Sequence, residues 1–489
     1  MRKLNLRILT TLALVLQLAV VGGVLLGAQQ SSVEPRLAAP PGGAVVELVR
    51  GEGNFNEPSV AVNAKEPEQV VAAFQSPAGV AYSRDAGKTW SIAEGTAPTD
   101  YKVSGDVSVT FDNQGRAFLC YIAFDKLGTE NYWAHNATRN GIFVRRTLDG
   151  GRTWEKHAAA VIAQKTAPGI PFEDKPGIVA DNTNSRFAGN VYVGWTEFTL
   201  TKSVILFSRS TDGGVTWSKP SEISTHEGLP RDDTGAVEGF TAAVGADGTL
   251  YAAWADGSEI AFATSRDGGQ SFSSSRAILK TAPSYFALAN VFRANGFPQI
   301  GIDPRLNRLF VSWADYRNGD LDVFCSTSSD GGVQWSEAAR VNTDALHNGA
   351  DQFFQWMAVD PVDGSANLVF YDRRADPDNR KVNFVLARST DGGRTFRNYA
   401  WTSKQFDPEG GFIGDYSGIA AYAGRVYGIW GRNARADENA ETPKKAETQE
   451  KPKEEEPLSS DGSQNKPRRT KRVQIVEVGV ADFSTASSH

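Results

Sequence analysis

The sequence predicts an all-β fold that forms a single β-propeller, and three observations lead to this prediction. A turn-forming stretch, Ser210-Thr-Asp-Gly-Gly-Val-Thr-Trp217, recurs with the frame S/T-x-D-x-G-x-T/S/Q-W/F. Its copies are about 60 residues apart, a period typical of repeat architectures. Short apolar runs between the copies alternate with turn residues, which indicates strands. The six copies are centred on Asp85, Asp149, Asp212, Asp267, Asp330 and Asp391.

The residue types of the repeat are those of a tight turn. Aspartate accepts backbone N–H groups within a turn, and glycine adopts backbone angles that other residues resist. The flanking Ser or Thr can hydrogen-bond locally, and the terminal Trp or Phe can pack between neighbouring sheets. Every copy has its aspartate, whereas one active site needs only one or two. We therefore predict that the six aspartates are structural.

Each repeat contains three strand-like runs before the turn, as in residues 57–63, 70–74 and 80–83. After the sixth turn, residues 415–421 and 425–430 start a further unit without a turn of this kind. Residues 473–480 and 44–49 can supply its last two strands. A propeller hides its last sheet edge by closing a blade with strands from both chain ends. The sequence thus predicts seven blades, with six as the alternative.

The rest of the chain divides by composition. A basic start followed by the apolar residues 8–28 indicates an export signal, either a cleaved peptide or a retained anchor. We expect a protein that is secreted, periplasmic or anchored by this segment, and a membrane contact only through it. The mixed charges of residues 434–472 predict disorder. The predicted parts are 1–28 (signal or anchor), 29–43 (linker), 44–433 (propeller), 434–472 (insertion) and 473–484 (final strand).

Composition also narrows the partners and cofactors. A net charge of −6 argues against nucleic acid. Cys120 and Cys325 fall in non-neighbouring repeats, so we expect buried thiols and no disulfide. Five histidines without a Cys/His cluster argue against zinc. A calcium site stays open, since Asp344, Asn348 and Asp351 offer oxygen ligands. We expect a monomer with a glycan or similar polysaccharide ligand.

The recurring stretch resembles the Asp-box, or BNR repeat, of the sialidase superfamily. This resemblance implies that the box joins the third and fourth strands of a blade, on the face opposite the active site. It also implies a glycan substrate, three arginines that hold a carboxylate, a Tyr–Glu nucleophile pair and an Asp acid/base. The sequence departs from the family pattern in two ways: the Arg-Ile-Pro position reads Asn56-Glu57-Pro58-Ser59, and the predicted blades number seven rather than six.

The connections opposite the boxes are long, as in residues 125–140 and 278–297, which favours that face for binding. First strands there begin with charged residues, and second strands end in acids, tyrosines and arginines. Aligning the first strands places Glu57, Asp106, Asp174 or Lys175, Glu238 and Asp415 near the mouth of the central channel.

Two hypotheses use these residues. In a glycoside hydrolase of exo-sialidase type, or one acting on another acidic sugar, the catalytic candidates are Asp315, Asp372, Tyr371, Tyr316 and Glu197. The substrate-binding candidates are Arg317, Arg373, Arg374, Arg432, Trp133, Glu57 and Asp415. In the alternative, the chain is a non-catalytic binding module whose acidic mouth holds a cation or a protein loop. Acids and arginines at strand ends also pair structurally, as Asp315 with Arg317 or Asp372 with Arg373 would.

Overall fold

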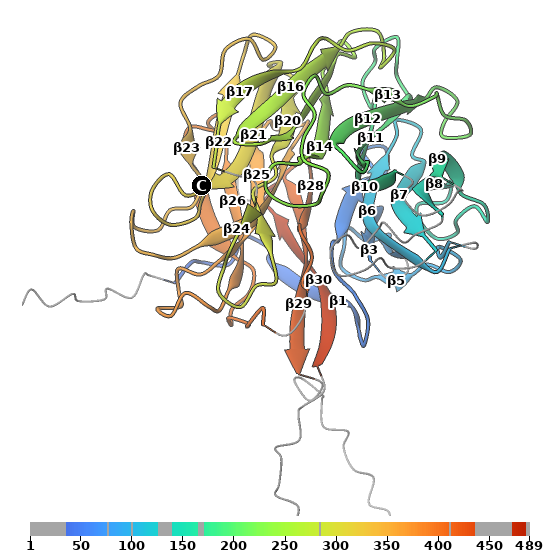
Figure 1. Cartoon of the computed structure of the whole chain (residues 1–489). Coiled ribbons are helices and arrows are strands. Elements are labelled where there is room, and N and C mark those ends of the chain that lie inside the picture. The colour runs from blue at the N-terminus through green and yellow to red at the C-terminus, as the bar shows by residue number, and fades with distance from the viewer. Residues whose placement is uncertain are drawn as a thin grey trace, which may run out of the picture. The chain divides into compact units, whose positions relative to one another are not determined.

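The computed structural model describes residues 36–75, 78–98, 101–125, 139–164, 171–282, 285–409, 412–435 and 472–485. These residues contain strands and turns but no helix, and from Leu37 onward they belong to one compact unit. Seven four-stranded antiparallel sheets occur among them, with their inner strands in contact around a common axis (Figure 1). The predicted seven-bladed, all-β propeller is confirmed.

Six blades follow the chain order, each from its inner to its outer strand. Blade 1 comprises β2 (Ser59–Val62), β3 (Val70–Phe74), β4 (Gly79–Ser83) and β5 (Ser91–Ile92). Blade 2 comprises β6 (Val103–Phe111), β7 (Ala117–Phe124), β8 (Asn140–Thr147) and β9 (Ala159–Gln164). Blade 3 comprises β10 (Phe172–Ala180), β11 (Val191–Phe198), β12 (Ser203–Ser210) and β13 (Ser221–Glu222).

Blade 4 comprises β14 (Val237–Val244), β15 (Leu250–Asp256), β16 (Glu259–Ser265) and β17 (Arg276–Lys280). Blade 5 comprises β20 (Gln299–Asp303), β21 (Arg308–Asp315), β22 (Asp322–Ser328) and β23 (Ala339–Arg340). Blade 6 comprises β24 (Gln352–Val359), β25 (Ala366–Asp372), β26 (Asn383–Ser389) and β27 (Arg397–Ala400). Between blades 4 and 5, β18 (Tyr285–Phe286) and β19 (Ala294–Asn295) form a small two-stranded sheet.

Blade 7 is closed by both ends of the propeller, as predicted. Its order is β28 (Gly418–Tyr422), β29 (Arg425–Arg435), β30 (Arg472–Asp482) and β1 (Ala44–Gly51). Because β1 pairs antiparallel with β30, no covalent hairpin joins the third and fourth strands, and this blade has no box. Residues before β1 are also tied to the propeller, since the Ala400 amide donates to the Ala38 carbonyl at 2.9 Å.

The six boxes form the predicted turns between third and fourth strands. In the third box, Asp212 accepts hydrogen bonds from the Thr216 amide at 3.0 Å and the Ser210 hydroxyl at 2.7 Å. The same pattern recurs at Asp85, Asp149, Asp267, Asp330 and Asp391. Box aromatics pack on the preceding blade, as Trp335 does on Phe262 with ring centroids 5.9 Å apart. The structural role of these aspartates therefore lies in the turn itself.

Inner strands begin with a local irregularity that positions the site. In β6, β10, β14 and β24 the pairing with the second strand shifts near its start, which marks a β-bulge. Residues at these bulges adopt left-handed backbone angles, with φ of 48° at Asp106, 47° at Lys175 and 53° at Phe354. Glu57, just before β2, has φ of 48°. Such angles cost non-glycine residues free energy and cluster at functional sites.

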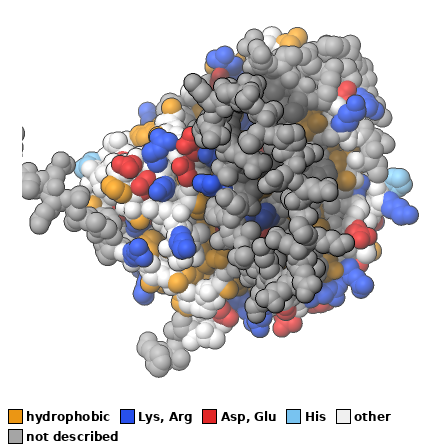
Figure 2. All heavy atoms as spheres, turned by 90° about the horizontal axis from the view of Figure 1, so that it is seen from below, with side chains coloured by type: hydrophobic (Ala, Val, Ile, Leu, Met, Phe, Trp, Pro, Cys, Tyr) orange, Lys and Arg blue, Asp and Glu red, His pale blue; other side chains and the backbone are white. Residues whose placement is uncertain are grey.

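Further sequence predictions concern the terminal segment, the charged insertion, the two cysteines and the surface charge. The signal or anchor segment, Trp133 and most of residues 434–472 lie outside the described residues. Within the described ranges, no helix has the length and hydropathy that would cross a bilayer. Cys120 and Cys325 are buried thiols. Figure 2 shows the molecule from the side on which β29 and β30 project. On the coloured part of this surface, Lys and Arg lie interspersed with Asp and Glu.

Candidate functional site

Charged side chains from five blades converge at one end of the propeller axis, on the face opposite the boxes. We call this group the mouth cluster. Its members come from the starts of inner strands and from the loops before β14 and β20. It consists of Glu57, Asp106, Asp174, Lys175, Asp232, Glu238, Tyr285, Arg293 and Asp415.

Lys175 is the centre of the mouth cluster. Its ammonium lies 2.6 Å from Asp415, 3.5 Å from Glu238 and 3.8 Å from Asp232. Its side chain is only 6% exposed, and its backbone amide donates to Asp106 at 3.2 Å. Burial by itself would lower the pKa of Lys175, but the surrounding carboxylates hold that pKa well above its usual value. The ammonium is thus a fixed positive charge.

Arg293 and Tyr285 close the cluster from the loop that contains β18 and β19. Arg293 forms ion pairs with Asp232 and with Asp415, and its side chain is 27% exposed. The Tyr285 hydroxyl donates to Asp232 and lies 3.2 Å from the nearer Glu238 oxygen. This loop is held in place by a further hydrogen bond, from Asn295 to the Asp415 carbonyl at 2.8 Å. The starts of five inner strands and two loops thereby meet at one buried site.

Burial and like charge perturb the carboxyl groups in different directions. Burial, followed by the charge of Asp232, raises the pKa of Glu238 well above its usual value. Burial and the charge of Asp106 do the same for Asp174. Burial would also raise the pKa of Asp232, but Lys175 and Arg293 hold it below the usual value. Titratable groups whose pKa values are driven apart within one cluster are characteristic of functional sites.

An axial cavity continues from the mouth cluster into the propeller. Its first chamber, of about 60 Å³, is lined by Lys175, Trp356 and Tyr416 among others. A second chamber of about 140 Å³ follows, lined by inner-strand residues such as Ile178 and Gln299. The mouth cluster therefore lies between the loops of this face and a partly open central channel.

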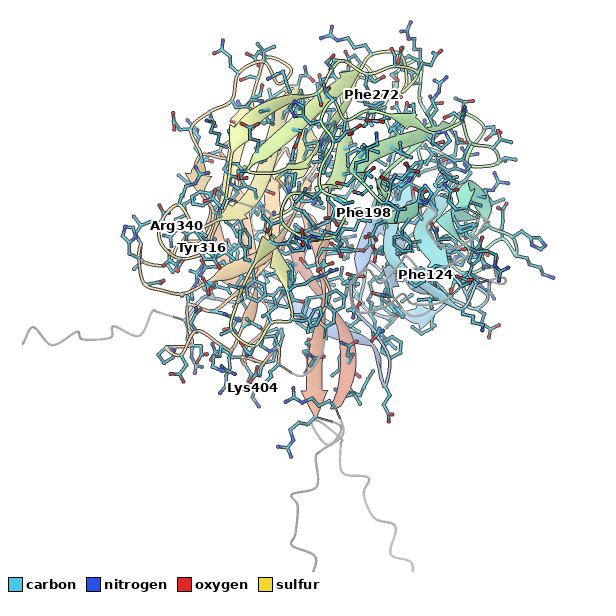
Figure 3. All side chains as sticks on the ribbon, viewed as in Figure 1. Phe124, Phe198, Phe272, Tyr316, Arg340 and Lys404 are labelled. Atoms are coloured by element: carbon cyan, nitrogen blue, oxygen red, sulfur yellow. The ribbon has the colours of Figure 1, made fainter. Side chains whose placement is uncertain are left out.

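The Asp315 group does not reach the mouth cluster. Asp315, at the end of β21, is buried and pairs with Arg317 at 2.6 Å, and it also accepts the Trp313 indole N–H at 2.8 Å. The Tyr316 ring packs on Phe286 with centroids 5.2 Å apart. In Figure 3, Tyr316 and Phe124 lie on opposite sides of the view. The structural pairing of Asp315 with Arg317 is present as anticipated.

The residues at the end of β25 are also engaged elsewhere. Asp372 pairs with Arg374 at 2.6 Å, not with Arg373, which corrects the pairing expected from the sequence. Residues two apart on an extended chain face the same side, so Arg374 is the neighbour that reaches Asp372. Tyr371 is fully buried, and its hydroxyl donates to the Gly431 carbonyl at 2.7 Å. Arg373 donates to the Ala289 carbonyl at 2.7 Å and so supports the loop that carries Arg293.

Of the other candidates, Glu57 and Asp415 lie in the mouth cluster, where Glu57 accepts the Asp415 amide at 3.2 Å. Arg432 pairs with Glu477 at 3.0 Å in blade 7. Glu197 lies opposite Glu173 on the neighbouring strand, and burial and the charge of Glu197 raise the pKa of Glu173 to about 8. The catalytic and substrate-binding roles assigned to these residues stay predictions.

The three residues considered for calcium lie between blades 5 and 6. Asp344 pairs with Arg340 at 3.0 Å and accepts the Asn348 amide at 2.8 Å. Asp351 accepts the Asn379 amide at 2.6 Å. Their oxygens are thus bound to protein donors, and this arrangement gives calcium no support there.

Two members of the mouth cluster were missed in the sequence. Asp232 and Arg293 lie in irregular loops, where no strand register assigns a direction to a side chain. The only signal was the unusual length of the segment from 278 to 297. The contact of Tyr285, in the same segment, with two carboxyl groups likewise follows no pattern in the sequence.

No family model matches the chain, and no curated protein is significantly similar to it. Solved structures of similar fold include a Hadza microbial sialidase, at 16% identity over 74% of this chain and 70% of that chain, with a TM-score of 0.46. They also include a PL25 ulvan lyase, at 11% identity over 80% of this chain and 92% of that chain, with a TM-score of 0.44. A third is YCF48 bound to D1 peptide, at 13% identity over 81% of this chain and 96% of that chain, with a TM-score of 0.42. Likenesses of this extent say nothing about activity. The seven blades and their hydrogen-bonded aspartate turns give the chain a sialidase-like propeller fold.

Proposed function

We propose that this chain is an exported glycoside hydrolase whose reaction takes place at the mouth cluster. One observation carries the proposal: the Tyr285 hydroxyl contacts Asp232 and lies 3.2 Å from Glu238. A tyrosine held against a glutamate is the nucleophile pair that the resemblance to sialidases implies. The pair lies beside the cations Lys175 and Arg293, in a cluster whose backbone is strained, and both features are common at catalytic sites.

The geometry assigns a role to each member of the pair. The Tyr285 oxygen attacks the anomeric carbon of the sugar while the glycosidic C–O bond breaks. Asp232, whose pKa is held below its usual value by Lys175 and Arg293 despite its burial, accepts the phenolic proton. Glu238, whose pKa is raised by burial and by the charge of Asp232, keeps its proton and donates it to the departing sugar oxygen. Asp232 fixes the direction of the hydroxyl through its hydrogen bond. Arg293, with 27% of its side chain exposed, forms an ion pair with Asp232 beside this pair. Water then releases the sugar from the tyrosine in the second half of the reaction.

The charges of the site favour a neutral sugar over an acidic one. Lys175 and Arg293 are already bound by carboxylates of the cluster. Arg317, Arg374 and Arg432 are paired with neighbouring acids. An added substrate carboxylate would therefore face more negative than positive charge, and like charges at short range repel.

The test is hydrolysis of a panel of aryl glycosides by the purified full chain, with neutral, amino and acidic sugars, including a sialoside. We expect turnover of a neutral glycoside and a loss of kcat on the order of a thousandfold in Tyr285→Phe. Tyr316→Phe is the matched control, because that ring packs on Phe286, which is not a member of the mouth cluster, and its loss of a hydroxyl should leave kcat unchanged. The proposal is refuted if no glycoside is turned over, or if Tyr285→Phe retains full activity.

A second function is favoured by the burial of the cluster. Its carboxyl groups are almost inaccessible, and the loop around β18 and β19 is fastened over them by Arg293. A propeller that binds a glycan without cleaving it would show this closed arrangement. The same panel distinguishes the two, because binding on a glycan array with no turnover by a folded protein would support the non-catalytic function.

Export is the part of the proposal that rests on residues 1–28 alone. Its test is fractionation of cells that express the full chain or a chain lacking this segment. Retention of both forms in the cytoplasm would contradict it.

A further inference from the structure

The mouth cluster has more carboxyl groups than its described cations can neutralise. Six carboxyl groups face two cations, Lys175 and Arg293, which form ion pairs with Asp232, Glu238 and Asp415. Among the described residues the other three, Glu57, Asp106 and Asp174, have no ion pair. They are buried, which makes an uncompensated charge costly. Such an excess calls for protons or for a further cation.

Three carboxyl groups of the mouth cluster are arranged as ligands of one ion. Asp174, Asp232 and Glu238 each offer an oxygen, and the three oxygens lie within 4.8 Å of one another. They come from β10, from the loop before β14 and from β14 itself. Oxygens bound to one Ca²⁺ at about 2.3–2.6 Å can be up to about 5 Å apart. The three oxygens therefore fit a single ion of this size.

Asp174 supplies an independent indication of a ligand. Its side chain is 1% exposed, and one carboxylate oxygen accepts the Lys175 amide at 3.0 Å. The other oxygen is buried and has no hydrogen-bond partner. Buried polar atoms are almost always satisfied, and one that is not points to a missing ligand or ion.

Lys175 does not fill this position. Its ammonium lies closest to Asp415, at 2.6 Å, and is 3.5 Å and 3.8 Å from Glu238 and Asp232. Arg293 likewise reaches Asp232 but forms its second pair with Asp415. The side of the cluster formed by Asp174, Asp232 and Glu238 thus keeps its oxygens turned toward one another.

We propose that Asp174, Asp232 and Glu238 form a binding site for a divalent cation of the calcium type at the mouth of the propeller axis. Hard oxygen ligands with several carboxylates are what Ca²⁺ prefers. The site differs from the Asp344, Asn348 and Asp351 group in Asp174, whose second carboxylate oxygen is buried and has no hydrogen-bond partner. If the proposed hydrolase function holds, an ion at this site would offset the negative charge around the Tyr285 hydroxyl, which attacks the sugar in that reaction.

The test measures ion binding without any substrate. The full chain is stripped with a chelator and titrated calorimetrically with Ca²⁺, and Asp174→Asn and Asp344→Asn are titrated beside it. We expect one ion per chain, weakened about tenfold or more in Asp174→Asn and unchanged in Asp344→Asn. Circular dichroism shows whether each variant is folded. Should Asp174→Asn not fold, Glu238→Gln replaces it.

A second readout reports the place of the ion. Tb³⁺ in a calcium site emits when an excited aromatic ring lies close by, so the emission should fall in Tyr285→Phe and persist in Tyr316→Phe. The absence of any binding by the parent chain overturns the proposal, as does binding lost in Asp344→Asn but kept in Asp174→Asn. Ion binding without glycoside turnover would refute the hydrolase and support the ion site. Glycoside turnover without ion binding would support the hydrolase and refute the ion site.

Discussion

The glycine two residues after the aspartate of each box should be among the least replaceable residues of the chain, and Gly332 allows the effect to be worked out. It has φ of +87°, and its amide donates to the Ser328 hydroxyl at 2.9 Å. A Cβ added to it would lie 2.5 Å from a ring carbon of Phe262 in blade 4. In Gly332→Ala we expect a cost of about 1 kcal/mol for the left-handed backbone. Overpacking against the buried ring adds about 1–3 kcal/mol.

Gly257 provides the matched control. It also has a positive φ, of +61°, but a Cβ there would meet nothing within 4 Å. Gly257→Ala should therefore cost only the backbone part, about 1 kcal/mol. The assay is urea unfolding followed by tryptophan fluorescence and circular dichroism, with the shift in midpoint compared between the variants. Equal shifts would show that the contact between blades contributes nothing, and an unchanged midpoint in Gly332→Ala would refute the reasoning altogether.

Three further predictions concern buried charge, acid stability and a buried hydroxyl. Lys175→Met should reduce the free energy of unfolding by about 3–5 kcal/mol, because it leaves carboxylates buried without their cation. Lys202→Met removes a partly exposed ion pair with Glu227 and should reduce it by less than about 1 kcal/mol. Equal losses of unfolding free energy in denaturant would contradict this prediction. Burial would raise the pKa of Asp212, but hydrogen bonds in its turn lower that pKa from 3.8 to about 2. The stability that Asp212 contributes is therefore present above pH 3.8 and is lost as the pH falls through about 2. Between these pH values the melting temperature of the parent should fall more than that of Asp212→Asn, and equal falls would exclude this contribution. Tyr371→Phe removes the hydrogen bond to Gly431 and should cost about 1 kcal/mol with no change in the turnover of any glycoside that the chain hydrolyses; a large loss of kcat in a stable variant would instead support the catalytic role predicted for Tyr371.

Much of the site could be predicted because inner strands alone line the axis of a propeller. Aligning the first strands brought Glu57, Asp106, Lys175 and Asp415 to the mouth, and the structure places them together there. The ends of the second strands were expected at the same place. They lie one strand farther from the axis, about 5 Å outward, and Asp315 accordingly pairs with its own neighbour.

The sequence by itself determined the repeat, the strand order and the closure of the last blade. These features depend on local turn chemistry and on the need to hide a sheet edge, both of which are written in short stretches of residues. Only the tertiary structure decided which charges meet. Asp232 and Arg293 come from loops without a periodic pattern and are 61 residues apart, yet their side chains form an ion pair. Closing the ring of blades sets that distance, and no local pattern of residues encodes it.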